Sequence, residues 1–163
     1  MWLFFCKFIQ QKLIKMFENL LNLVKENSGD GIIDNPAIPN EKNEDAIQTT
    51  TTSIFESLKG QFSSGNMSSI MDMFKGGGAS ATQSSAGNVV QTNVVSELMK
   101  KFGIDNSQAT EIANKLVPKV MEKFVNKTND PNDKSFDLPS IVNSLGGTTA
   151  RGGIGSMIKG LFN

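Results

Sequence analysis

NVVQTNVVSELMKKFGIDNSQATEIANKLVPKVMEKFV, residues 88–125, decides the fold, because this stretch predicts two helices joined by a tight turn. Apolar residues recur at intervals of three and four on both sides of Gly103. We expect Asn88 to cap the first helix, and Gly103 to end it in the left-handed conformation. We expect Asp105 to cap the second helix, with Gln108 reaching back to complete a capping box. The stretch therefore predicts an all-α fold.

The second of these helices carries a continuous apolar face, which must be buried against other elements. The face consists of Ala109, Ile112, Ala113, Leu116, Val117, Val120 and Phe124. Pro118 lies within it and removes one backbone hydrogen bond, so we expect the helix to bend there.

The rest of the chain also favours helices separated by turns. Asn40 is expected to cap a helix that runs to Phe62, although the β-branched run at residues 49–52 would suit a strand better. A short helix is expected over residues 67–74 and another over residues 138–145. The expected organisation is an N-terminal helical region over residues 1–75, a flexible linker over 76–88, a helical bundle over 89–147, and a glycine-rich tail with a short amphipathic helix over 148–163.

Composition excludes several kinds of chemistry. The 163 residues include no histidine and no tyrosine, which rules out a histidine-based nucleophile triad, a histidine zinc ligand and a tyrosine acid or base. Sixteen basic residues balance sixteen acidic ones, so no global field attracts nucleic acid or anionic lipid. The single cysteine, Cys6, excludes an intramolecular disulfide and suits a cytoplasmic location.

The first residues of the chain are apolar in every direction around a helix, and include Trp2, Phe4 and Phe5. Lys7 ends this run far short of the ~20 residues that cross a bilayer. From Ile9 onward the pattern becomes amphipathic, which is typical of a helix that packs on a core. Interfacial binding to a membrane through the aromatic residues and nearby lysines is the alternative interpretation.

A row of lysines on the second helix, Lys115, Lys119 and Lys123, suggests a basic face for duplex DNA. Acidic residues share that helix, and the only arginine of the chain is the distant Arg151. We therefore favour a solvated face over a DNA-binding helix-turn-helix.

Two further patterns have some features of ligand sites. Oxygen ligands are closely spaced at Asp130, Asn132, Asp133 and Asp137, but the glycine and bidentate glutamate of a calcium loop are absent. The glycines at residues 152–155 lack the lysine and the preceding strand of a phosphate loop. We therefore expect no metal and no cofactor.

Several short runs together resemble the YidB-like family of small bacterial proteins, a domain-of-unknown-function group. These runs are FGIDNSQA (102–109), LVPKVM (116–121), MFENLL (16–21), NPAIPNE (35–41) and KTNDPND (127–133). The resemblance implies an all-helical fold with a homeodomain-like helical arrangement, a bacterial origin, and no catalytic residues to transfer. Family members tend to begin near the position of Met16, which makes residues 1–15 a candidate upstream extension.

These observations predict a non-catalytic helical interaction or assembly module. Amphipathic helices exceed what one small bundle can bury, so we expect a protein partner or self-association. Attachment to a membrane surface through the N-terminal helix is the second hypothesis, and DNA binding is the third. The candidate interaction residues are Trp2, Phe4, Phe5, Lys115, Lys119 and Lys123.

Overall fold

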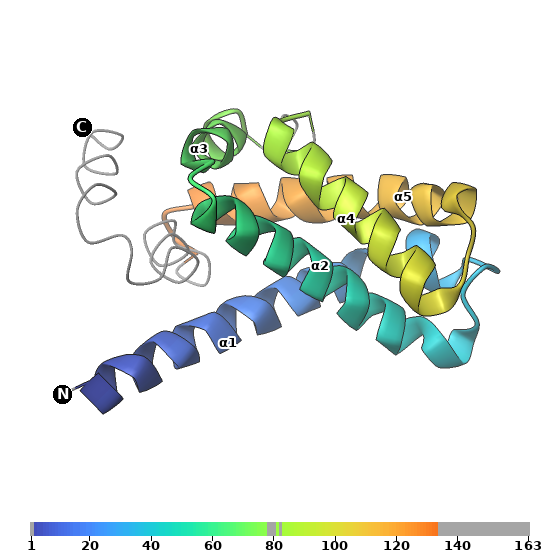
Figure 1. Ribbon diagram of the computed structural model, residues 1–163, viewed down its shortest axis with the longest axis horizontal. Helices are drawn as coiled ribbons and strands as arrows, with labels where there is room; N and C mark the ends of the chain where they lie inside the picture. The colour runs from blue at the N-terminus through green and yellow to red at the C-terminus, as the bar shows by residue number, and fades with distance from the viewer. Residues whose placement is uncertain (1, 78–80, 82, 134–163) are drawn as a thin grey trace.

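Five α-helices form the framework of the protein in a computed structural model, which describes residues 2–77, 81 and 83–133 (Figure 1). They are α1 (Trp2–Asn27), α2 (Asn43–Ser63), α3 (Met67–Lys75), α4 (Ser85–Phe102) and α5 (Asn106–Asn129). A π-helical turn, η1 (Gly29–Ile33), and a 3₁₀ turn, η2 (Asn40–Lys42), lie between α1 and α2. The described residues contain no strand, which confirms the all-α prediction.

The helix pair α4 and α5 follows the predicted capping signals at its turn. Gly103 ends α4 with a φ of 65°, a left-handed conformation that glycine adopts at little cost. Asp105 accepts a hydrogen bond from the Gln108 backbone N–H (2.8 Å), while the Gln108 side chain accepts one from the Asp105 N–H (3.3 Å). The predicted capping box is therefore confirmed.

The start of α4 differs from the prediction. The helix begins at Ser85 and is capped by Ser84, whose hydroxyl accepts a hydrogen bond from the Gly87 N–H (3.0 Å), so Asn88 lies inside the helix. Ala86 and Gly87 are buried, and the Ala86 carbonyl accepts a hydrogen bond from the Gln61 side chain of α2 (3.1 Å). Packing against α2 therefore orders residues that were expected to belong to a flexible linker.

Two other expected boundaries were wrong. Asn40 does not cap α2: it begins η2, and its side-chain oxygen accepts a bond of 3.5 Å from the Asn43 side chain at the start of α2. Helix α5 continues past Val125 to Asn129, and the hydroxyl of the buried Thr128 donates to the Phe124 carbonyl (2.8 Å). The predicted helix over residues 138–145 and the tail over 148–163 lie outside the described residues.

The threonine run at residues 49–52 is helical, as predicted, despite its strand preference. Thr50 and Thr51 are fully buried in the face of α2 that packs on its neighbours. Burial has therefore outweighed the small helix propensity of these residues.

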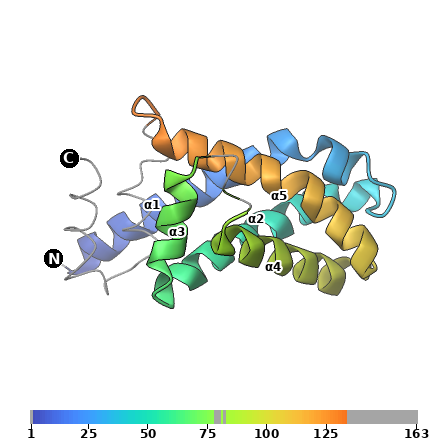
Figure 2. The same cartoon turned by 90° about the horizontal axis from the view of Figure 1, so that it is seen from above.

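One apolar core joins the N-terminal and C-terminal helices. Its fully buried large side chains include Leu20 of α1, Leu58 of α2, Met73 of α3, Leu98 of α4 and Phe124 of α5. Helix α2 packs on α4, and α4 packs on α5, with α1 lying against both α2 and α5 (Figures 1 and 2).

Turn η1 joins this core through a close approach to α5. A Cβ atom at Gly31 would lie 3.4 Å from the Cβ of Leu116, so the absence of a side chain lets the turn pack closely on the helix. The neighbouring Ile32 is fully buried. This turn was not predicted, because its π-helical conformation has no clear local sequence signal.

Candidate interaction surface

The N-terminal end of α1 extends beyond the helices on which the rest of α1 packs. In the two views of the fold, the N-terminal end of α1 projects past helices α2–α5 (Figures 1 and 2). The buried core side chains that α1 contributes are Met16, Leu20, Leu23 and Val24. Among the described residues of this helix, burial therefore begins at Met16.

The described side chains that precede Met16 lie in solvent. Lys7, Gln11, Ile14 and Lys15 are all exposed. Ile14 retains 56% of its surface, the largest value among the exposed large apolar residues of the described chain. Residues 2–15 of α1 are called the N-terminal segment below.

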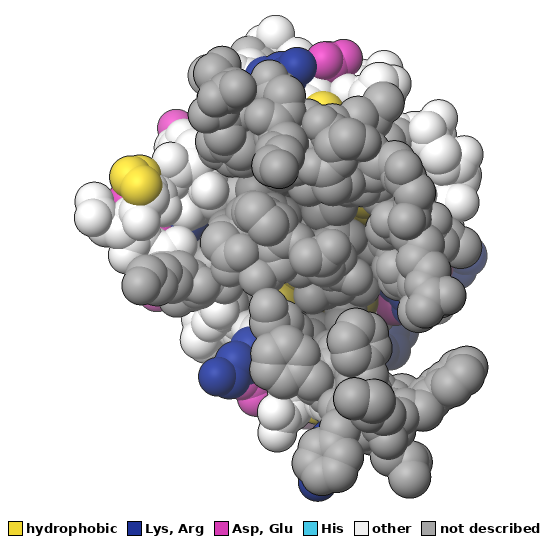
Figure 3. Space-filling view, turned by 90° about the vertical axis from the view of Figure 1, so that its left-hand side faces the viewer, with side chains coloured by type: hydrophobic (Ala, Val, Ile, Leu, Met, Phe, Trp, Pro, Cys, Tyr) yellow, Lys and Arg dark blue, Asp and Glu magenta, His cyan; other side chains and the backbone are white. Residues whose placement is uncertain are grey.

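The candidate residues Trp2, Phe4 and Phe5 lie in the first turns of α1, within the N-terminal segment. Their side chains lie outside the described part of the structure. Figure 3 views the molecule from this end, and around its margin basic and acidic side chains are interspersed on the described surface.

The lysine row of α5 lies on the exposed side of the helix, as predicted, but two of its members are paired. The Lys115 ammonium lies 2.7 Å from a Glu111 carboxylate oxygen, and the Lys119 ammonium lies 3.4 Å from Asp30 in η1. Lys123 is exposed and has no ion pair among the described residues.

These ion pairs affect the pKa of Lys115 and the positive field of the lysine row. The hydrogen bond to Glu111, followed by the charge of that carboxylate, raises the pKa of Lys115 above its ordinary value. Glu111 and Asp30 offset much of the positive field that a phosphate backbone would require. The Glu111 pair could be anticipated from its spacing of four residues, whereas Asp30 is 89 positions away from Lys119 in the chain.

The acidic residues in the loop after α5 form hydrogen bonds and an ion pair within the chain. Asp130 accepts a hydrogen bond from the Asn132 backbone N–H (2.9 Å), and Asp133 pairs with Lys127 at 3.3 Å. Asp137 lies outside the described residues, as do the glycines at 152–155. Within the described chain, no cluster of three or more histidine, cysteine, aspartate or glutamate residues could hold a metal ion.

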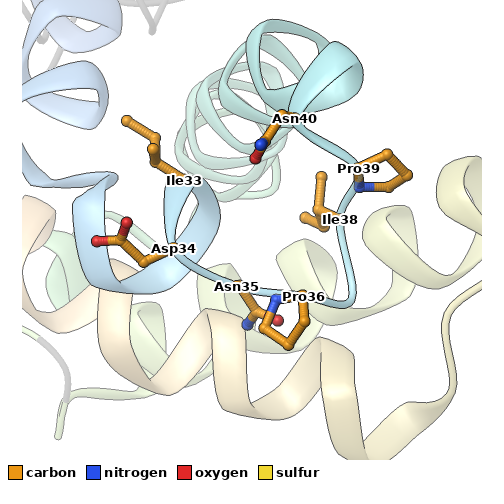
Figure 4. Close-up of a pocket in the computed structure, with 7 residues that line it drawn as sticks. All are labelled: Ile33, Asp34, Asn35, Pro36, Ile38, Pro39 and Asn40. Atoms are coloured by element: carbon orange, nitrogen blue, oxygen red, sulfur yellow. The ribbon is translucent and has the colours of Figure 1, made fainter.

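A shallow recess of about 400 Å³ lies in the connection between η1 and α2 (Figure 4). It is lined by Ile33, Asp34, Asn35, Pro36, Ile38, Pro39 and Asn40. The Asn35 side chain is already used within the chain: it accepts a hydrogen bond from the Ala37 N–H (2.9 Å) and donates to the Gly31 carbonyl (3.3 Å). The Asn35 side chain is therefore not free to bind a ligand in the recess.

Taken together, the fold and these surfaces define an all-α helical-bundle protein in which the N-terminal end of α1 projects past the other helices (Figures 1 and 2). In the part of the chain that the structure describes, no helix combines the length and apolarity needed to span a bilayer. No family model, no curated protein and no solved structure matches this chain. The resemblance to the YidB-like family therefore stays a prediction.

Proposed function

We propose that this protein is a non-catalytic helical interaction or assembly module, in which the bundle holds the N-terminal segment available to a partner. The observation that carries the proposal is the change in burial along the described side chains of α1. The helix is unbroken from Trp2 to Asn27, yet the buried side chains among its described residues begin at Met16.

Composition supports the same proposal. Most residues of the N-terminal segment are apolar, and a helix with such a surface gains free energy when a partner removes it from water. The sequence lacks histidine and tyrosine, two of the side chains most suited to proton transfer near neutral pH. Membership of the YidB-like family, a bacterial origin and a cytoplasmic location are parts of this proposal.

The experiment that tests the proposal needs no knowledge of the partner. The full chain and a chain that begins at Met16 are compared for binding of anilinonaphthalene sulfonate, a dye whose fluorescence rises on apolar surface. We expect enhanced fluorescence from the full chain and little from the shorter one. Far-ultraviolet circular dichroism should show that the shorter chain is still folded as a helical protein. Equal dye binding by the two chains would contradict the proposal.

A further inference from the structure

We propose that the N-terminal segment binds a membrane surface that contains anionic phospholipid. This inference rests on the proposed function, because it names the partner of the same segment. Three observations carry it: the distribution of apolar residues around the helix, the local charge, and the projection of the helix end.

The apolar residues at the start of α1 are not confined to one stripe. Successive helical residues are rotated by about 100°, so the apolar run at residues 2–6 occupies every side of the helix. Further along, Ile14 is exposed, whereas Met16, two residues later, is buried in the core. A partner helix covers a single stripe and would leave the other apolar positions in water. A lipid interface can surround the end of the helix.

The charge of the segment suits an anionic surface. The chain as a whole has a formal net charge of zero, but Lys7, Lys12 and Lys15 precede the first acidic residue, Glu18. Lys7 and Lys15 are exposed. Anionic headgroups attract such lysines, whereas a second copy of this chain would bring like charges together.

Helices α2–α5 do not extend as far as the N-terminal end of the segment (Figures 1 and 2). Its residues form a helix about 20 Å long at 1.5 Å per residue. The N-terminal end projects past helices α2–α5 in both views of the fold (Figures 1 and 2). The segment can therefore meet a membrane while these helices remain in water.

Trp2 provides a direct reporter for this binding, because it is the only tryptophan and the chain has no tyrosine. The full chain is titrated with vesicles of phosphatidylcholine alone and with vesicles of phosphatidylcholine and phosphatidylglycerol in equal parts. We expect the Trp2 emission to shift to the blue with the anionic vesicles, and the shift to weaken as salt is added. Vesicle flotation measures the bound fraction independently.

A triple variant, Lys7→Gln, Lys12→Gln and Lys15→Gln, tests the charge contribution. We expect its affinity for the anionic vesicles to fall on the order of 100-fold. The matched control replaces Lys42, Lys75 and Lys101, which are exposed and have no ion pair among the described residues. We expect the control variant to bind like the original chain.

Several results would overturn the lipid assignment. The first is equal binding of the full chain to the two kinds of vesicle. The second is an equal loss of affinity for the anionic vesicles in the two lysine variants. The third is a blue-shifted Trp2 emission before any vesicle is added. In the last case, a mass above that of the monomer in sedimentation would identify a second copy as the partner. Such a result would leave the proposed interaction function standing, whereas equal dye binding by the full and shortened chains would remove the proposed function itself.

Discussion

Thr50 is one of three described residues, with Asn43 and Thr49, that bury a side-chain oxygen without a hydrogen-bond partner. It is fully buried, and its hydroxyl has no hydrogen-bond partner among the described residues. The neighbouring Thr51 is equally buried, but its hydroxyl donates to the Ile47 carbonyl at 2.8 Å. Burial of a hydroxyl without a partner costs free energy, so the two threonines should respond differently to the same substitution.

Thr50→Val replaces the unpaired hydroxyl with a methyl group of similar size. We expect it to raise the free energy of unfolding by about 1 kcal/mol. Thr51→Val, the matched control, removes a hydrogen bond and should lower the free energy of unfolding by up to about 1 kcal/mol. Urea denaturation measures both values, and equal changes in the two variants would show that the Thr50 hydroxyl is satisfied in solution.

The pKa of Lys115 predicts how the contribution of its ion pair to stability depends on pH. Glu111 raises its pKa above the ordinary value of 10.5, because the carboxylate accepts a hydrogen bond from the ammonium and attracts its charge. Since the folded pKa exceeds the unfolded one, the pair stabilises the fold below the ordinary lysine pKa, and this contribution disappears as the pH rises through the raised pKa.

Nuclear magnetic resonance of the labelled Lys115 side chain measures this pKa directly. We expect a lower value in the Glu111→Gln variant than in the original chain. An unchanged titration in that variant would show that Lys115 and Glu111 do not pair in solution.

At the scale of the elements, the ends of α4 show what local sequence can and cannot specify. The C-terminal end was predicted correctly, because Gly103 meets a backbone requirement that depends only on its own φ. The N-terminal end was not, because both Ser84 and Asn88 can cap a helix. Contacts with α2, such as the bond from Gln61 to the Ala86 carbonyl, accompany the earlier start, and the sequence pattern contains no information about them.

A pair of glycine substitutions tests the role of the α4–α5 turn. Gly103 has a φ of 65°, so Gly103→Ala should lower the free energy of unfolding by roughly 1–2 kcal/mol. Gly60 lies inside α2, and a Cβ added there would meet no other atom within 4 Å, so Gly60→Ala should raise the free energy of unfolding by roughly 0.5–1 kcal/mol. Opposite signs in thermal or urea unfolding are expected, and a stabilising Gly103→Ala would contradict the left-handed turn.

The candidate interaction surface was also predicted in part from the sequence. The exposed row of Lys115, Lys119 and Lys123 followed from its spacing in the sequence, because residues four apart share one side of a helix. The ion pair between Lys119 and Asp30 could not be predicted, since it depends on how η1 packs against α5. Long-range contacts of this kind leave no periodic pattern in the chain.

For the molecule as a whole, the described side chains of α1 change from exposed to buried at Met16. Met16, Leu20, Leu23 and Val24 belong to the same core as α2, α4 and α5. The described side chains before Met16 lie in solvent. Residues that remain in water in both the folded and the unfolded state contribute little to the free energy of folding or to the surface exposed on unfolding.

The most direct test of this division is urea unfolding of the full chain and of the chain that begins at Met16, followed by circular dichroism. The slope of the free energy against urea concentration reports the surface exposed on unfolding, and the midpoint then reports stability. We predict the same midpoint and the same slope for both chains, because none of the described side chains before Met16 belongs to the core. A lower midpoint together with a smaller slope in the shorter chain would show that the segment is buried within the fold and is not available to a partner.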